Sequence, residues 1–172
     1  MDDQSKEERF PVLALNDKQL LEELFSILSK QTTGDPYGED GAYAAALRKL
    51  PVGLRAFAAT HHLDISLTLD DIGWHFLNFG EPGLVTETEV GLRVLGLADL
   101  ADWFAEARDI MGPLRHVINA PEDYDECLTR HGHWDRIKEL TRKAQDLGIG
   151  CSEDVSGSPI YDAWGQIHAA AP

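Results

Sequence analysis

The side chains most able to do chemistry in this sequence are its histidines. Seven occur, and His61, His62 and His75 lie close along the chain to Asp70 and Asp71. A zinc site needs three or four convergent ligands, and helical sites commonly place two histidines four residues apart. That spacing is absent, and adjacent histidines point about 100° apart on a helix. We therefore expect no metal site, and the alternative is a metal-dependent hydrolase built on this His/Asp cluster.

Paired acids and thiols give a weak catalytic signal as well. Two carboxylates act as acid and base when their environments separate their pKa values, usually with one in an apolar pocket. Asp70 and Asp71 instead stand at a predicted helix start, where capping is the simpler role. Cys127 follows Glu126 and lacks the basic setting of a nucleophilic thiol, and the chain contains no GxSxG motif. We expect no catalytic residue, no cofactor and no enzymatic activity.

The feature that stands out is an excess of carboxylates in the middle of the chain. The whole sequence has 30 Asp and Glu against 15 Lys and Arg, a formal net charge of −15. Residues 70–126 contain 13 acids, three Arg and no Lys, a net of −10. A surface of mixed sign would be equally soluble with less self-repulsion. The clustering therefore favours a function for these charges.

Amphipathic helices must position the acids. Thr68 with Asp71, and Thr86 with Glu89, have the spacing of capping boxes, so each pair predicts a helix start. Residues 80–83, Gly-Glu-Pro-Gly, predict a turn between the two helices, and Gly96 predicts the end of the second.

The next helix, residues 97–111, is predicted to have two distinct faces. Its apolar face contains Leu97, Leu100, Trp103, Phe104, Ala107, Ile110 and Met111. A different arc carries four carboxylates with no base among them: Asp99, Asp102, Glu106 and Asp109. Acids on one helix face are about 5 to 6 Å apart per turn, a spacing comparable with phosphates along a nucleic-acid strand.

The remaining pattern is helical too. Apolar spacing and punctuation predict helices at residues 17–31, with Asn16 as the N-cap, and at 39–50, 52–63, 122–130 and 134–147. Residues 65–69 are the one candidate strand, and they overlap a cap signal. We predict an all-α fold, a single compact domain of about seven to eight helices at residues 16–147. Residues 1–15 are expected to form a flexible lead-in, and residues 148–172 a linker and a short C-terminal helix that packs on the domain or on a partner subunit.

Composition also restricts location and partners. The first nine residues are polar and charged, and no run of about 18 apolar residues occurs. Cys127 and Cys151 form no CxxC motif or disulfide framework, which suits a reducing compartment. We expect a cytoplasmic protein. A large negative charge disfavours direct binding of nucleic acid or anionic membrane, because both need Lys and Arg, and it favours a basic protein partner.

Part of the central region resembles a known family. The segments involved are Phe76-Leu77-Asn78-Phe79-Gly80 with the acidic turn that follows, residues 89–96, and residues 101–111. They resemble the all-helical DNA-mimic-protein family first seen in Neisseria, otherwise a domain family of unknown function. Phe76, Asn78, Gly80, Gly96, Glu106 and Ala107 can be laid on its pattern, whereas Leu69, Asp70 and Asp71 stand where the family has Asn-Gly-Gly. The resemblance implies a helical fold that can form a homodimer, and it implies DNA mimicry as a function.

The function predicted from charge and resemblance together is binding. An acidic helical surface would meet a basic protein, such as a nucleic-acid-binding regulator or a toxin that it neutralises as an immunity protein. The predicted partner-binding residues are Glu87, Glu89, Asp99, Asp102, Glu106, Asp109, Glu122 and Asp123. The second alternative is a structural protein that oligomerises through the tail at residues 160–170.

Overall fold

A computed structural model describes residues 17–150 and 158–169, and it confirms the predicted all-α class. These residues form nine α-helices and one 3-10 helix, against about seven to eight helices expected, and no strand occurs among them. By the density of internal contacts, the chain divides into two compact units, Met1–Thr33 and Gly34–Pro172.

The first unit contains helix α2 (Asp17–Gln31), with the bounds predicted from the sequence. Its end is closed by the amide of Thr32, which donates to the carbonyl of Leu28 at 2.8 Å. Asn16, the predicted N-cap, and the lead-in at residues 1–15 lie outside the described residues, as does Cys151.

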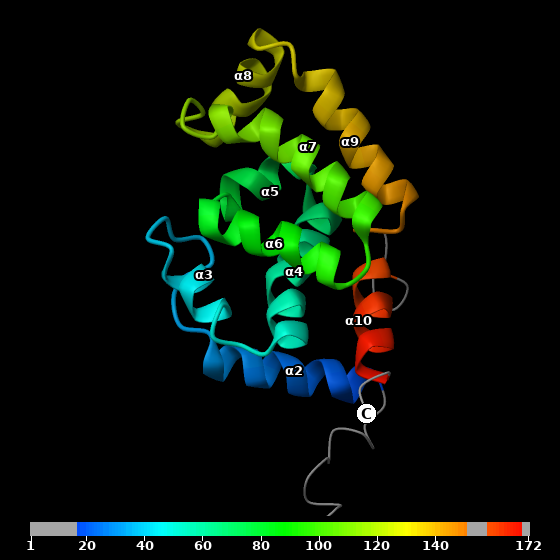
Figure 1. Cartoon of the computed structure of the whole chain (residues 1–172). Helices are drawn as coiled ribbons and strands as arrows, with labels where there is room; N and C mark the ends of the chain where they lie inside the picture. Colours follow the sequence, from blue (N-terminus) through cyan, green and yellow to red (C-terminus); the bar gives the residue numbers. More distant parts are fainter. Residues whose placement is uncertain (1–16, 151–157, 170–172) are drawn as a thin grey trace, which may run out of the picture. The chain divides into compact units, whose positions relative to one another are not determined.

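The second unit is organised around α4 (Val52–Leu69), an apolar helix buried on almost all sides, as expected of a central helix. Four helices pack against it: α3 (Ala42–Leu47), α5 (Ile72–Phe79), α6 (Pro82–Val94) and α10 (Pro159–Ala169) (Figure 1). The contact with α6 is close, because a Cβ on Gly91 would lie 3.0 Å from the carbonyl oxygen of Ala56. The hydroxyl of Thr88 donates to the carbonyl of Ala59 at 3.1 Å.

A second layer covers α5 and α6. Helix α7 (Ala98–Leu114) packs on both and on α9 (Trp134–Asp146), and the indole of Trp103 donates to the carbonyl of Leu140 at 2.8 Å. Helices η2 (Pro121–Asp123) and α8 (Tyr124–Arg130) follow, and α8 packs on the start of α9 (Figure 1). The predicted core face of α7 is confirmed at Leu100, Trp103, Phe104, Ala107 and Met111, all buried.

The two predicted capping boxes are wrong. Helix α4 continues through Thr68, whose hydroxyl donates to the carbonyl of Asp64 at 3.0 Å inside the helix. Thr86 does the same to Pro82 at 2.8 Å, because α6 already begins at Pro82. Threonine can satisfy its hydroxyl on the preceding turn, so it need not mark a start. Carboxylates cap instead: Asp71 accepts from the amides of α5, and Glu81 from those of α6.

Other boundaries also differ from the predictions. Helix α3 is shorter than the predicted 39–50, whereas α4 runs six residues beyond 63 and includes the candidate strand at 65–69. Leu67 is buried in α4, so core packing favours helix there. The apolar spacing of the predicted helix 134–147 places Ile137, Leu140, Ala144 and Leu147 on its core face. The first three are buried, as that spacing predicts, but Leu147 follows α9 and is 45% exposed.

Asp71 joins three helices at the start of α5. Its side chain is 4% exposed, and one oxygen accepts from the amides of Gly73 and Trp74 and from the hydroxyl of Tyr124 on α8, the last at 2.5 Å. Its other oxygen lies 2.8 Å from the ammonium of Lys138 on α9. Gly73 is required here, because a Cβ would lie 1.9 Å from the Tyr124 hydroxyl.

We predict that Asp71→Ala lowers the free energy of unfolding by about 2–4 kcal/mol. The change removes an N-cap, worth about 1 kcal/mol, and leaves the buried hydroxyl of Tyr124 without a partner, at a cost of about 1–3 kcal/mol. Urea unfolding followed by circular dichroism measures it. Asp70→Ala, at the exposed neighbouring position, is the control and should cost at most about 1 kcal/mol. Equal losses in both variants would contradict this role.

Helix α10 packs on α4 of its own chain. The rings of Tyr161 and Trp164 lie 5.6 and 5.3 Å from that of Phe57, and Ile160 is buried beside them. The Tyr161 hydroxyl is buried and has no hydrogen-bond partner among the described residues. Burial, with a smaller effect of the Asp64 charge, raises its pKa to about 12, so the phenol is neutral.

We predict that Tyr161→Phe keeps or raises stability, by up to about 1 kcal/mol, because it removes a buried donor that has no acceptor. Tyr43→Phe is the matched control, since the Tyr43 hydroxyl lies 3.0 Å from Nε2 of His62, and its loss should destabilise by about 1 kcal/mol. Thermal unfolding compares the two variants. A larger loss of stability in Tyr161→Phe than in Tyr43→Phe would show that the Tyr161 hydroxyl has a hydrogen-bond partner.

Candidate functional site

Three of the four carboxylates predicted to form a stripe on α7 are ion-paired. Asp102 is 2.8 Å from Arg93 of α6, and Asp109 is 2.9 Å from Arg108 of α7 itself. Glu106 accepts from Nε of Arg136 of α9 at 2.7 Å. The predicted absence of bases along this face is wrong, because Arg93 and Arg136 reach it from neighbouring helices and Arg108 from α7 itself. Asp99 is exposed and has no ion pair with the described residues.

The two predicted acids on α6 are also occupied. Glu87 is 3% exposed and lies 2.7 Å from Arg48 and 2.5 Å from Arg55. Glu89 is 20% exposed and pairs with Arg93 and Arg108. Glu87 is therefore a buried carboxylate that joins α6 to α4 and to the end of α3 through two partly exposed arginines, and it does not lie on the accessible surface.

Four exposed carboxylates follow one another closely on η2 and α8. We call this group the acidic edge: Glu122, Asp123, Asp125 and Glu126, all exposed. Glu126 pairs with Arg130, and the other three have no ion pair or side-chain hydrogen bond with the described part of the chain. Acids at a helix N-terminus are favoured by the helix dipole, which accounts for part of this clustering. Glu122 and Asp123 were predicted as partner-binding residues, whereas Asp125 and Glu126 were counted only in the charge.

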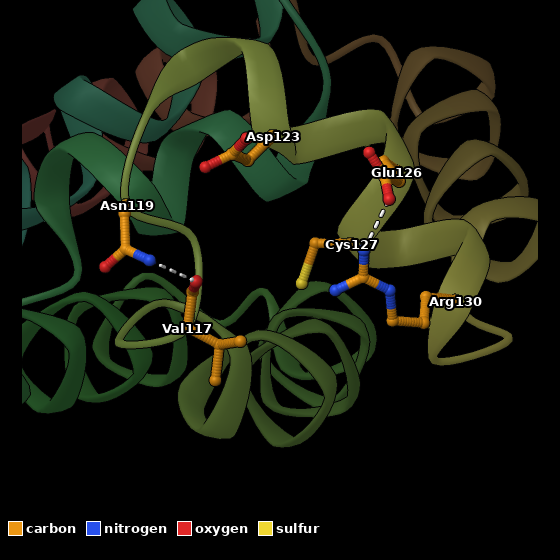
Figure 2. Close-up of a pocket in the computed structure, with 6 residues that line it drawn as sticks. All are labelled: Val117, Asn119, Asp123, Glu126, Cys127 and Arg130. Atoms are coloured by element: carbon orange, nitrogen blue, oxygen red, sulfur yellow. Dashed lines mark hydrogen bonds and ion pairs between the residues drawn. The ribbon is translucent and has the colours of Figure 1, made fainter.

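A small pocket opens beside the acidic edge (Figure 2). It has a volume of about 150 Å³ and is lined by Val117, Asn119, Asp123, Glu126, Cys127 and Arg130. Cys127 is a free, buried thiol whose sulfur points toward the hollow in Figure 2. The space suits the end of one long side chain better than a drug-sized ligand, which needs about 300 Å³ or more. Val117 and Asn119 carry no sequence signal, because a loop brings them here.

Three of the histidines, His61, His62 and His75, form an aromatic cluster inside the protein. The rings of His61 and His62 are 3.8 Å apart, and His62 stacks on Phe79 at 4.8 Å. His75 packs on the same phenylalanine at 5.4 Å. Among the described residues, no three His, Cys, Asp or Glu side chains are placed to hold a metal ion. The predicted His/Asp cluster does not assemble, since Asp71 is engaged with Tyr124 and Lys138.

One serine–histidine pair occurs within the cluster, between Ser66 Oγ and Nδ1 of His75 at 3.0 Å. It is not a nucleophile and base, because the Ser66 hydroxyl donates to the carbonyl of His62 at 2.8 Å, so His75 must be the donor to Ser66. Both residues are buried, and the pocket beside the acidic edge is lined by neither. The arrangement favours packing over chemistry.

Burial keeps all three imidazoles neutral. It lowers the pKa of His61 to about 3, that of His62 to about 4 and that of His75 to about 3. The charge that His62 would carry lowers the pKa of the other two further. Each pKa is thus well below the ordinary 6.5, and protonation opposes folding.

Comparisons with known proteins find no match to this chain among family models, curated proteins or solved structures. The resemblance to the DNA-mimic family therefore stays a prediction. None of the helices that the structure describes combines the length and apolar character that a bilayer crossing requires.

We predict that stability falls as the pH is lowered from about 7 to 5. The unfolded chain binds protons at these histidines near pH 6.5, and the folded chain does not. The three neutral histidines therefore cause no loss of stability above pH 6.5, and each one lowers the free energy of unfolding as the pH falls below that value. It should decrease by roughly 1–2 kcal/mol per histidine by pH 5. Urea unfolding at a series of pH values measures the slope.

The control for this pH dependence uses a histidine from outside the cluster. His62→Gln should reduce the slope by about one third, because one of three coupled imidazoles is lost. His131→Gln, at an exposed position, should leave it unchanged. Identical slopes in wild type and His62→Gln would show that these imidazoles do not drive the acid sensitivity.

Proposed function

We propose that this protein binds a basic protein through the acidic edge. The observation that carries the proposal is the contrast between two groups of acids. Five of the predicted acids on α6 and α7 are held by arginines, whereas Glu122, Asp123 and Asp125 are exposed and unpaired within the described residues. Unpaired carboxylates are the ones that can exchange water for a cation of the partner without first breaking an internal ion pair.

The pocket beside the acidic edge gives the proposed contact a specific point. Asp123 and Glu126 line it, so a lysine or arginine side chain of the partner can enter with a carboxylate on its path. Arg130 pairs with Glu126 across an exposed surface, and such pairs are worth only about 0–1 kcal/mol. An incoming guanidinium can therefore replace Arg130 on Glu126 at small cost.

Long-range electrostatics would bring the two proteins together. A chain with a net charge of −15 attracts a basic protein and raises the association rate, an effect that weakens as salt screens the charges. The partner class that fits is a nucleic-acid-binding regulator or a toxin. In the most specific form of the proposal, the acidic surface imitates DNA and occupies the nucleic-acid site of the partner. We propose in addition that the protein is located in the cytoplasm and forms a homodimer. The free, buried thiol of Cys127 suits a reducing compartment such as the cytoplasm.

The test is capture of basic proteins by the tagged full chain at low and high salt, with mass spectrometry of the proteins eluted. The triple variant Glu122→Gln, Asp123→Asn and Asp125→Asn should lose at least 10-fold of the salt-sensitive capture of a given basic protein. Each substitution changes charge with little change in shape, so folding should be preserved.

The matched control removes the same number of charges elsewhere. Glu23→Gln, Asp146→Asn and Asp162→Asn are exposed acids on α2, α9 and α10, outside the acidic edge. Together they should reduce capture less than two-fold. If both triple variants lose capture equally, net charge alone acts and the acidic edge has no special role. If neither loses it, the proposed surface is wrong.

A further inference from the structure

A second, larger hollow lies on another part of the same unit, where α4 ends, α5 begins and α9 passes by. It has a volume of about 350 Å³, within the range of small-molecule sites, and it is open to solvent. Its lining combines apolar, hydroxyl, acidic and basic groups: Leu67, Thr68, Leu69, Asp70, Asp71, Lys138, Thr141, Arg142 and Gln145. None of these residues belongs to the acidic edge.

Arg142 is the distinctive member of this lining. Among the described arginines, seven lie within ion-pair distance of a carboxylate: Arg48, Arg55, Arg93, Arg108, Arg115, Arg130 and Arg136. Arg142 alone of the described arginines has none, although the chain has twice as many acids as bases. A guanidinium without a carboxylate on the wall of a hollow is suited to a carboxylate supplied by a ligand.

The opposite charge stands at the rim of the same hollow. Asp70 is exposed, and its Oδ1 accepts from the amide of Asp71 at 2.8 Å, which leaves Oδ2 without a hydrogen bond in the described structure. Asp71 and Lys138, which also line the hollow, neutralise each other at 2.8 Å. The free charges of the hollow are therefore one cation and one anion.

Apolar surface completes the site. Leu69, the last residue of α4, is 80% exposed, the highest value among the large apolar side chains that the structure describes, and it lies in this hollow. Leu67 also lines the hollow and is buried. A ligand that covered Leu69 would remove apolar surface from water, which favours binding. The hollow thus offers a hydrophobic contact as well as two charges.

We propose that this hollow binds a small zwitterion of the α-amino-acid type with an aliphatic side chain. Arg142 takes the carboxylate, Asp70 takes the ammonium group, and Leu69 packs on the aliphatic side chain. A phosphate-bearing ligand fits less well, because the carboxylates of Asp70 and Asp71 line the same space and repel a dianion. A neutral apolar ligand would leave both free charges unused.

The test is isothermal titration calorimetry of the full chain with three probes that share the leucine side chain and differ in their charged groups. L-leucine carries both charges, N-acetyl-L-leucine lacks the ammonium group, and L-leucinamide lacks the carboxylate. Leucine should bind at least 10-fold more tightly than either analogue. Equal binding of leucine and leucinamide, or no binding of leucine at tens of millimolar, would overturn the proposal.

Variants assign each charge to its residue. Arg142→Gln should weaken leucine and N-acetyl-L-leucine by at least 10-fold and leave leucinamide unchanged, whereas Asp70→Asn should weaken leucine and leucinamide and leave N-acetyl-L-leucine unchanged. Lys143→Gln, an exposed cation on the next position of α9 that does not line the hollow, is the control and should bind like wild type. An equal loss in Lys143→Gln and Arg142→Gln would mean that general charge, and not this site, holds the probe.

Discussion

A buried carboxylate, Asp71, holds the helices that carry both proposed binding surfaces. It begins α5, accepts from the hydroxyl of Tyr124 on α8 and pairs with Lys138 on α9. The acidic edge lies at the start of α8, and the larger hollow is lined by α9 and by Asp71 itself. Burial, with the neighbouring acids, raises the pKa of Tyr124, so the phenol remains a donor. Both sites therefore depend on the contacts of one carboxylate that is itself almost fully buried.

Arginines decide which of the many carboxylates remain available. Arg93, Arg108 and Arg136 cover the face of α7, and Arg48 and Arg55 enclose Glu87. These pairs connect neighbouring helices, so they serve the packing of the unit more than recognition. The α8 segment has only Arg130, and its remaining acids face water. The surplus of acids along residues 70–126 is therefore largely paired on α6 and α7 and largely free at η2 and α8.

Periodicity predicted the helical class, the bounds of α2 and the core faces of α7 and α9, because amphipathic spacing is a local property. The starts of α5 and α6 were missed, since Thr68 and Thr86 resemble caps in sequence but bond back into their own helices. The availability of Glu87 and Glu106 could not be predicted either. Their arginine partners are 30 to 39 residues away in the sequence, so counting charges along the chain does not reveal the ion pairs.

The acidic edge offers exposed carboxylates to a basic partner, and three of them are unpaired within the described residues. Nuclear magnetic resonance can locate such binding, by following the backbone amides of the full chain during titration with an octa-arginine peptide. The largest chemical-shift changes should fall in residues 117–130 and should shrink as salt is added. Equal changes along the paired face of α7, or changes spread over the whole chain, would rule out this surface.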